Sequence, residues 1–233
     1  MPELPEIETI KNVIGPQIKG LTIEQITLSR PEIIAHPTAD EFCAAVTGQT
    51  ISFLSRRGKF LILHLKNDSR IILHLRMTGC LLAAPPDHPM EKHTHMILRL
   101  DSGTELHFSD TRRFGRFWLI QNGEEDTYSG IGNIYSDEIL FRAKIRPARP
   151  ANSLTEEEWQ RLAAEIPKCL SYFIEKNRIS PEEYLQGKGQ DYRNTPFLQV
   201  YGHGGEPCQN CGTTLVRTVI SGRSSVYCPA CQK

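Results

Sequence analysis

The first twenty positions place apolar residues at helical spacing. Apolar side chains recur every three or four positions, and Gly20 follows the last of them. This period predicts an amphipathic helix that begins almost at the N-terminus, ends near Gly20 and holds the N-terminal segment against the body of the protein. The apolar positions are Leu4, Ile7, Ile10, Ile14 and Ile18.

From about residue 21 to residue 121 the pattern changes to a period of two or to short β-rich runs. Turn sequences such as Lys66-Asn-Asp-Ser and Asp101-Ser-Gly separate these runs. The pattern predicts a β-sandwich, which forms with the first helix an N-terminal domain over residues 1–121. The runs cover residues 21–29, 51–54, 60–65, 71–76, 96–100, 105–108 and 117–121.

Helical signals return after a polar bridge at residues 122–130. We expect a short helix over residues 137–143 and a longer one that begins at a capping box of Thr155 and Glu158, runs toward Asn177 and kinks at Pro167. A polar, glycine-rich loop at 186–195 and a strand-like run at 197–201 follow. Residues 122–200 therefore form a predicted helical domain.

The last segment, residues 201–233, contains four of the seven cysteines in the pattern C-x2-C-x16-C-x2-C. Two such pairs close a tetrahedral four-sulfur shell with no open position, which suits one structural Zn²⁺ and excludes a catalytic metal. Two disulfides are the alternative, but they need an oxidising compartment for which the chain carries no targeting segment. Residues 213–220 and 224–227 predict a hairpin that turns at Ser221. The four cysteines are Cys208, Cys211, Cys228 and Cys231.

Composition narrows the class of protein. With 39% hydrophobic and 23% charged residues the chain can bury a core, and its longest apolar runs fall far short of the roughly 20 residues of a membrane span. The acidic opening lacks the cationic start of a signal peptide, so we expect a cytoplasmic protein without a membrane partner. The formal net charge is +0, but residues 52–77 and 208–233 are basic. These stretches are either part of a polyanion groove or ordinary solvated faces.

Several motifs resemble one family from end to end. They are Pro2-Glu-Leu-Pro-Glu-Ile-Glu, Arg57-Gly-Lys-Phe, His74-Leu-Arg-Met-Thr-Gly, Lys92-His-Thr-His, Asp110-Thr-Arg-Arg-Phe-Gly, Gly130-Ile-Gly-Asn-Ile-Tyr-Ser-Asp-Glu and the cysteine segment. In this order they resemble the bacterial formamidopyrimidine-DNA glycosylases. The resemblance implies an α+β fold with a partial helix-two-turn-helix and a zinc-finger hairpin. It also implies a nucleoid-associated monomer that binds double-stranded DNA containing an oxidised purine or an abasic site.

The resemblance implies a bifunctional base-excision repair enzyme, a glycosylase and abasic-site lyase, with Pro2 as nucleophile. Once Met1 is removed, Pro2 is a secondary amine with an ordinary pKa of about 8, against about 10.4 for lysine, so its neutral form can attack a sugar carbon. Glu3 matches the family's proton donor. In an arbitrary protein, Pro2 would be an ordinary first residue of a helix and Glu3 an acid at its start.

Other site residues follow from the same resemblance. Lys59 corresponds to the donor for β-elimination, and Arg223 to a phosphate-binding arginine that serves δ-elimination. Met77, Arg112 and Phe114 match the residues that fill the gap left by an extruded nucleotide, although apolar residues of this kind are otherwise most often core. The expected DNA-backbone contacts are His74, His93 and Asn133.

The chain departs from the family at two places. The family carries several dozen more residues between Trp118 and Gly130, including the first helix of the helix-two-turn-helix. The absence of this helix would expose apolar surface around Ile134 and Ile139 unless another helix or chain covers that surface. Asn177-Arg-Ile-Ser replaces a Gly-Gly-Ser/Thr-Thr run. An alternative function is therefore a non-catalytic zinc-finger protein that binds damaged DNA, because the missing segment impairs catalysis.

Overall fold

The computed structural model describes residues 2–121, 131–190 and 192–233. These residues form two compact units: Met1–Gly130 with Ile179–Asp191, and Ile131–Arg178 with Tyr192–Lys233. Helix α5 (Pro181–Gln186) therefore belongs to the first unit, although the sequence suggested a helical domain over 122–200. The reason is Tyr184, which is 2% exposed and joins the core of the first unit. The folds of both units together are α+β, as predicted.

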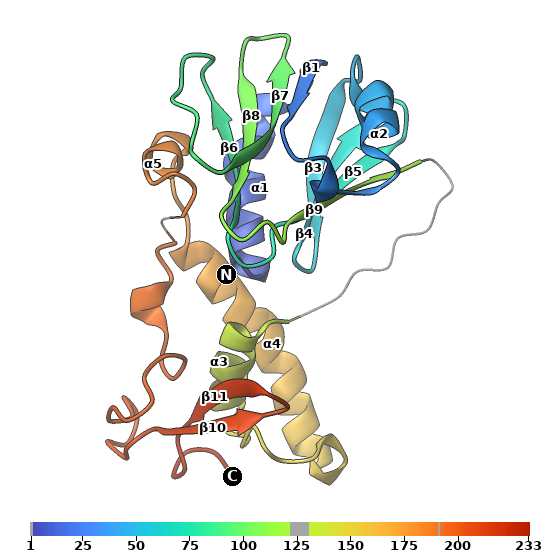
Figure 1. Cartoon of the computed structure of the whole chain (residues 1–233). Helices are drawn as coiled ribbons and strands as arrows, with labels where there is room; N and C mark the ends of the chain where they lie inside the picture. Colours follow the sequence, from blue (N-terminus) through green and yellow to red (C-terminus); the bar gives the residue numbers. More distant parts are fainter. Residues whose placement is uncertain (1, 122–130, 191) are drawn as a thin grey trace. The chain divides into compact units, whose positions relative to one another are not determined.

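The first unit contains two sheets with strand orders β1-β7-β8-β6 and β2-β9-β5-β4-β3 (Figure 1). Their inner faces share one apolar core with helices α1 and α2. The elements are α1 (Leu4–Ile18), β1 (Ile23–Leu28), β2 (Ile34–His36), α2 (Ala39–Val46), β3 (Ile51–Arg57), β4 (Phe60–Leu65), β5 (Arg70–His74), β6 (Gly79–Ala84), β7 (Thr94–Leu100), β8 (Glu105–Asp110) and β9 (Arg116–Ile120).

The N-terminal helix and all seven predicted β-runs are confirmed, with small shifts of their ends. The sequence patterns did not indicate β2, α2 or β6. All six residues of β6 are buried, so the strand lacks the alternation that marks a half-buried strand. The four-stranded sheet depends on β6 because that strand forms one of its edges.

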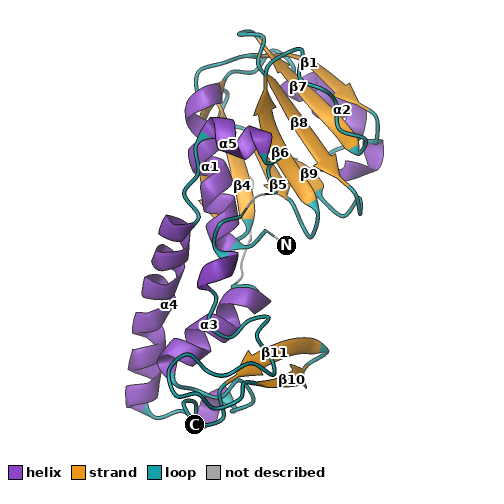
Figure 2. Ribbon diagram, turned by 90° about the vertical axis from the view of Figure 1, so that its left-hand side faces the viewer, coloured by secondary structure: helices purple, strands orange, loops and turns teal. Residues whose placement is uncertain are grey.

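The second unit contains helix α3 (Asn133–Ala143), helix α4 (Glu156–Lys176) and a hairpin of β10 (Val216–Ile220) with β11 (Arg223–Tyr227). Helix α4 begins at the predicted capping box and continues through Pro167. It packs against α3 (Figure 2), and Ile139 is only 3% exposed while Ile134 is half-buried, so the apolar surface expected there is covered at Ile139 and partly covered at Ile134. The polar bridge 122–130 lies outside the described residues.

The predicted strand at 197–201 is wrong. Thr195–Phe197 is a short 3-10 helix, and the backbone N–H groups of the three residues after Leu198 donate to the carboxylate of Glu138, at 2.9 to 3.0 Å, instead of to a neighbouring strand. Two further 3-10 turns, Pro31–Ile33 and Ala151–Ser153, complete the elements. Among the described residues, no helix is long and apolar enough to cross a membrane.

Candidate functional site

The start of α1 places Pro2 and Glu3 in a buried position. Glu3 is 0% exposed, and its backbone N–H donates to Oε2 of Glu6 at 2.8 Å in a capping box. Nζ of Lys59 lies 3.7 Å from Oε1 of Glu3, and the lysine side chain is 14% exposed. The structure therefore brings together three of the four predicted catalytic residues around the first turn of the helix.

Lys59 reaches this position from the turn between β3 and β4, where Arg57 pairs with Phe60. Gly58 has φ +56, a value that a residue with a side chain rarely adopts. Arg56 donates through Nη1 to the carbonyl of Gly58 at 3.0 Å and through Nε to Glu8 of α1 at 2.7 Å. Burial raises the pKa of Glu8, but hydrogen bonds from Lys11 and Arg56 outweigh burial and lower it, so the carboxylate stays charged and ties the turn to α1.

His74 ends β5, which pairs with β4. Burial lowers the pKa of His74 to about 4, with further lowering by the charges of Arg76 and Lys59. Its Nδ1 accepts the backbone N–H of Arg76 at 2.9 Å. At neutral pH the ring is therefore uncharged, with its proton on Nε2, and it can donate one hydrogen bond to an anion.

Met77, Arg112 and Phe114 form an exposed cluster. Met77 and Phe114 are 44% and 47% exposed, unusual values for large apolar side chains. Nη1 of Arg112 lies 2.9 Å from Sδ of Met77, and its Cζ lies 4.8 Å from the centroid of the Phe114 ring. The two apolar residues are therefore not core, and the three side chains together could enter a base stack.

Asp110, which is 1% exposed, supports this cluster. Its carboxylate accepts a hydrogen bond from Thr78 and the backbone N–H groups of Arg112, at 3.1 Å, and Gly115, at 2.7 Å. A Cβ on Gly115 would lie 2.5 Å from the ring of Phe108, so the close turn requires glycine. Asp110 is not among the site residues predicted from the sequence, although it lies within one of the family motifs.

His93 immediately precedes β7, and its carbonyl accepts the backbone N–H of Asp110 at 3.0 Å. It lines a pocket of about 290 Å³ in the first unit. His95, by contrast, is 5% exposed and bonds through Nε2 to the carbonyl of Asp110 at 2.8 Å. The two histidines therefore have different surroundings, and only His93 lines the pocket.

In the second unit, Asn133 and Arg223 line a pocket of about 230 Å³ at the N-terminus of α3. Nδ2 of Asn133 donates to the carbonyl of Ser224 at 2.7 Å. Ser221 and Gly222, with φ of +49 and +77, make the tight turn that precedes Arg223. An exposed guanidinium beside a helix N-terminus is suited to bind a phosphate. Arg223 belongs to a different unit from the other three predicted catalytic residues.

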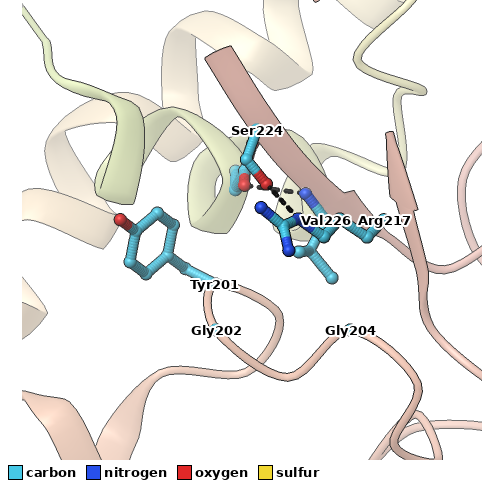
Figure 3. Close-up of a pocket in the computed structure, with 7 residues that line it drawn as sticks. Tyr201, Gly202, Gly204, Arg217, Ser224 and Val226 are labelled. Atoms are coloured by element: carbon cyan, nitrogen blue, oxygen red, sulfur yellow. Dashed lines mark hydrogen bonds between the residues drawn. The ribbon is translucent and has the colours of Figure 1, made fainter. Parts of the chain in front are cut away.

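Two buried acids of α3 organise the surroundings of the hairpin. Asp137 accepts hydrogen bonds from Ser225 at 2.6 Å and from the backbone of Val226 at 2.9 Å, while burial raises its pKa. Glu138 binds the backbone of residues 199–201 as described above. Asp137 lines a pocket that Figure 3 shows, with a volume of about 290 Å³, and there Nε of Arg217 donates to Oγ of Ser224 at 2.8 Å. None of these supporting roles is evident from the sequence pattern.

The four cysteines of the C-terminal segment meet at one point. All four Sγ atoms lie within 4.8 Å of one another, and the cysteines are not bonded as disulfides. Zn–S bonds of about 2.3 Å place tetrahedral sulfurs about 3.8 Å apart, so the cluster fits one zinc ion. The protein therefore has one structural zinc site, and the disulfide alternative is wrong. The remaining three cysteines, Cys43, Cys80 and Cys169, do not belong to this cluster. Burial raises the pKa of the Cys80 thiol and of the Cys169 thiol to about 12.

The fold and these side chains define a two-unit α+β protein with a C-terminal zinc finger. Comparisons with known proteins identify the family of DNA-repair enzymes to which such a protein belongs. Residues 1–117 match the N-terminal domain of formamidopyrimidine-DNA glycosylase, residues 111–183 its H2TH domain, and residues 205–233 the zinc finger found in FPG and IleRS. A formamidopyrimidine-DNA glycosylase of Desulfitobacterium hafniense is 38% identical over 273 positions, covering 100% of both chains. One of Carboxydothermus hydrogenoformans is 39% identical over 264 positions with the same coverage.

Solved structures give the same result. A mutant of the Lactococcus lactis FPG in complex with a Fapy-dG containing DNA has a TM-score of 0.89 and 32% identity, covering 100% of both chains. The complex of Lactococcus lactis Fpg with abasic-site DNA has a TM-score of 0.88 and 31% identity, again covering 100% of both chains. The chain belongs to the formamidopyrimidine-DNA glycosylase family, and it is a DNA glycosylase of base-excision repair.

Proposed function

We propose that Pro2, freed by removal of Met1, is the nucleophile of a combined glycosylase and abasic-site lyase. Its nitrogen bonds to C1′ of the damaged nucleotide while the bond from C1′ to the base breaks, and the departing electron pair is protonated. Glu3 supplies and accepts protons next to this carbon. The observation that carries the proposal is the buried Glu3 carboxylate beside Pro2, with the Lys59 ammonium 3.7 Å away.

The attached nitrogen then loses its proton and the bond from C1′ to the ring oxygen O4′ breaks, with O4′ taking up a proton, so that C1′ and the nitrogen form an iminium. This iminium is an electron sink, which makes the 2′ proton acidic. Loss of that proton and cleavage of the 3′ carbon–oxygen bond is β-elimination, for which Lys59 is the proposed donor. Cleavage at the 5′ side is δ-elimination, which we assign to Arg223 together with binding of the adjacent phosphate. Both steps only move electron pairs and protons, so they require no oxidant or metal.

The proposed substrate is double-stranded DNA with an oxidised purine, a formamidopyrimidine or an abasic site. Met77, Arg112 and Phe114 would fill the space left by the extruded nucleotide, because two of them expose large apolar surface. His74, His93 and Asn133 would bind the DNA backbone. We also propose that the protein acts as a cytoplasmic, nucleoid-associated monomer, in which residues 1–121, completed by helix α5, form the catalytic domain and residues 201–233 form the zinc finger.

Borohydride trapping tests this function. Protein with Met1 removed is mixed with duplexes containing 8-oxoguanine or an abasic site, and borohydride reduces an imine to a stable covalent adduct. We expect an adduct with wild-type protein and a weaker one with Pro2→Gly, which should still bind the duplex, because the primary amine of an N-terminal glycine replaces the proline nitrogen. Mass spectrometry of the trapped peptide should place the adduct on Pro2.

The alternative function, a non-catalytic binder of damaged DNA, is favoured by one observation. The alignment with the Desulfitobacterium relative has 273 positions, 40 more than the 233 residues of this chain. Folded, zinc-loaded protein that binds the duplexes without forming an adduct would support this alternative and rule out the imine mechanism.

A further inference from the structure

We propose that Lys188 is an additional phosphate-binding residue of the DNA interface and that Glu91 holds it in place before DNA binds. The inference rests on the proposed function, because the phosphate would belong to the DNA substrate. It concerns the pocket of about 290 Å³ that His93 lines in the first unit. Lys188 comes from the turn after α5, far in sequence from the other residues of this pocket.

The groups that line this pocket suit a phosphate. Three of them can carry positive charge, namely Lys92, His93 and Lys188. Hydroxyl groups come from Ser109 and Thr111, whereas the hydroxyl of Thr78 already donates to Asp110. Hydroxyls and cations together are the side chains that most often contact phosphate oxygens of DNA.

Two acids also line the pocket, Asp110 and Glu91, but each has partners. The carboxylate of Asp110 accepts from Thr78 and from two backbone N–H groups, so its charge is directed toward the protein. Oxygen Oε1 of Glu91 lies 2.8 Å from Nζ of Lys188. The side chain of Glu91 is 34% exposed and that of Lys188 is 64% exposed. Water and salt therefore weaken this ion pair, and a phosphate can replace the carboxylate.

The backbone beneath Lys188 is fixed although its head group is exposed. The carbonyl of Lys188 accepts a hydrogen bond from Sγ of Cys80 at 3.2 Å, and the N–H of Gly189 donates to Tyr184 at 2.9 Å. A Cβ on Gly189 would lie 2.3 Å from Sγ of Cys80, so this turn sits directly on β6. Because the turn is already ordered, binding a phosphate would cost only the freedom of one side chain.

The pocket adjoins the exposed cluster that is proposed to enter the base stack. Thr78 follows Met77 in the chain, and its hydroxyl accepts the backbone N–H of Arg112 at 3.1 Å. A backbone phosphate close to the extruded nucleotide would therefore come within reach of the pocket. Lys188 would contribute to binding rather than to bond breaking.

The test measures affinity for a duplex with a tetrahydrofuran abasic analogue, at several salt concentrations and with the full chain. Lys188→Ala should make the negative slope of log K against log salt shallower by about 0.9, so a fourfold rise in salt should weaken this variant about 3.5-fold less than wild type. Lys188→Arg should keep the wild-type slope. The control is Lys19→Ala, which removes an exposed lysine at the end of α1, in the same unit but outside the basic stretch 52–77, and should leave the slope unchanged.

A second variant separates a phosphate contact from a purely structural ion pair. Glu91→Gln should tighten binding in the wild-type background, because it frees Lys188, and this gain should vanish in the Lys188→Ala background. If Glu91→Gln and Lys188→Ala both weaken binding, the pair is structural. If the gain persists without Lys188, it is a long-range charge effect, and either result overturns the inference. Absence of duplex binding by wild-type protein would instead contradict the proposed function.

Discussion

The buried carboxylate of Glu3 lies 3.7 Å from the ammonium of Lys59, and both residues are held by local structure, Glu3 by the capping box and Lys59 by the glycine turn. A carboxylate without exposure to water is costly unless it has a charged partner. The two proposed proton-transfer groups are therefore also a structural pair. Substitutions here should affect stability and activity in different ways.

Glu3→Gln should separate these effects. Base excision should fall about 10²- to 10⁴-fold because the proton donor is lost, while stability should not fall because no charge remains to be buried. Lys59→Ala should destabilise the protein by about 1 to 3 kcal/mol, since it leaves the carboxylate without its ammonium. Urea unfolding of both variants and of the double variant checks this. A double variant no more stable than Lys59→Ala would contradict the pairing.

Asp110→Ala should disorder the exposed cluster of Met77, Arg112 and Phe114, although Asp110 is not itself a proposed DNA contact. Its removal leaves the hydroxyl of Thr78 and the backbone N–H of Gly115 without their acceptor, at a cost of about 3 kcal/mol, while the N–H of Arg112 keeps Thr78 as its acceptor. The loss of order should raise KM for lesion-containing duplex more than it lowers kcat. Asp101→Asn, at an exposed turn of the same unit, is the control and should match wild type in both measurements.

His74 gives a pH dependence with a defined sign. Its pKa is about 4 in the folded protein, through burial and then the charges of Arg76 and Lys59, and about 6.5 when unfolded. The unfolded chain binds the proton first, so the free energy of unfolding should decrease as the pH falls from about 6.5 to about 4. His74→Gln should show a smaller decrease in urea titrations at each pH. An equal slope in both proteins would exclude this group as the cause.

Zinc removal should unfold one unit and spare the other. The core of the finger includes Cys208, Cys228 and Phe141 of α3, so loss of the metal should extend into the second unit. The chain has two tryptophans, Trp118 in the first unit and Trp159 in the second, so Trp→Phe variants report on each unit by fluorescence.

Cys228→Ser should abolish zinc binding and change only the signal of Trp159. Cys43→Ser, at a half-buried thiol of the first unit, should keep a full equivalent of zinc. A simultaneous change of both tryptophan signals after chelation would show that the two units unfold together.

Period and turn chemistry were sufficient to predict α1, the β-runs and the start of α4, because each of these elements has one buried face or a local cap. They failed for β6, which is buried on both faces. Helix α2 carried a usable signal, the capping box of Thr38 and Glu41, which was overlooked. The strand at 197–201 was wrong because a distant carboxylate, Glu138, takes its N–H groups.

Local sequence pattern also predicted only part of the candidate site. Family motifs pointed to the residues proposed to meet DNA, and the structure brings Pro2, Glu3 and Lys59 together and gathers Met77 with Arg112 and Phe114. They did not reveal the groups that hold those residues. Asp110, and the pair of Glu91 with Lys188, act through contacts between segments far apart in the chain, and local pattern does not encode such contacts.

The docking of residues 179–191 onto β6 has a consequence for biosynthesis. The ribosome makes 48 residues of the second unit, Ile131–Arg178, before it reaches the segment that completes the first. Until then Cys80 and Leu81 lack the hydrogen-bond partners that Lys188 and Tyr184 provide. A nascent chain released before about residue 191 would carry an open apolar edge, a target for chaperones and proteases.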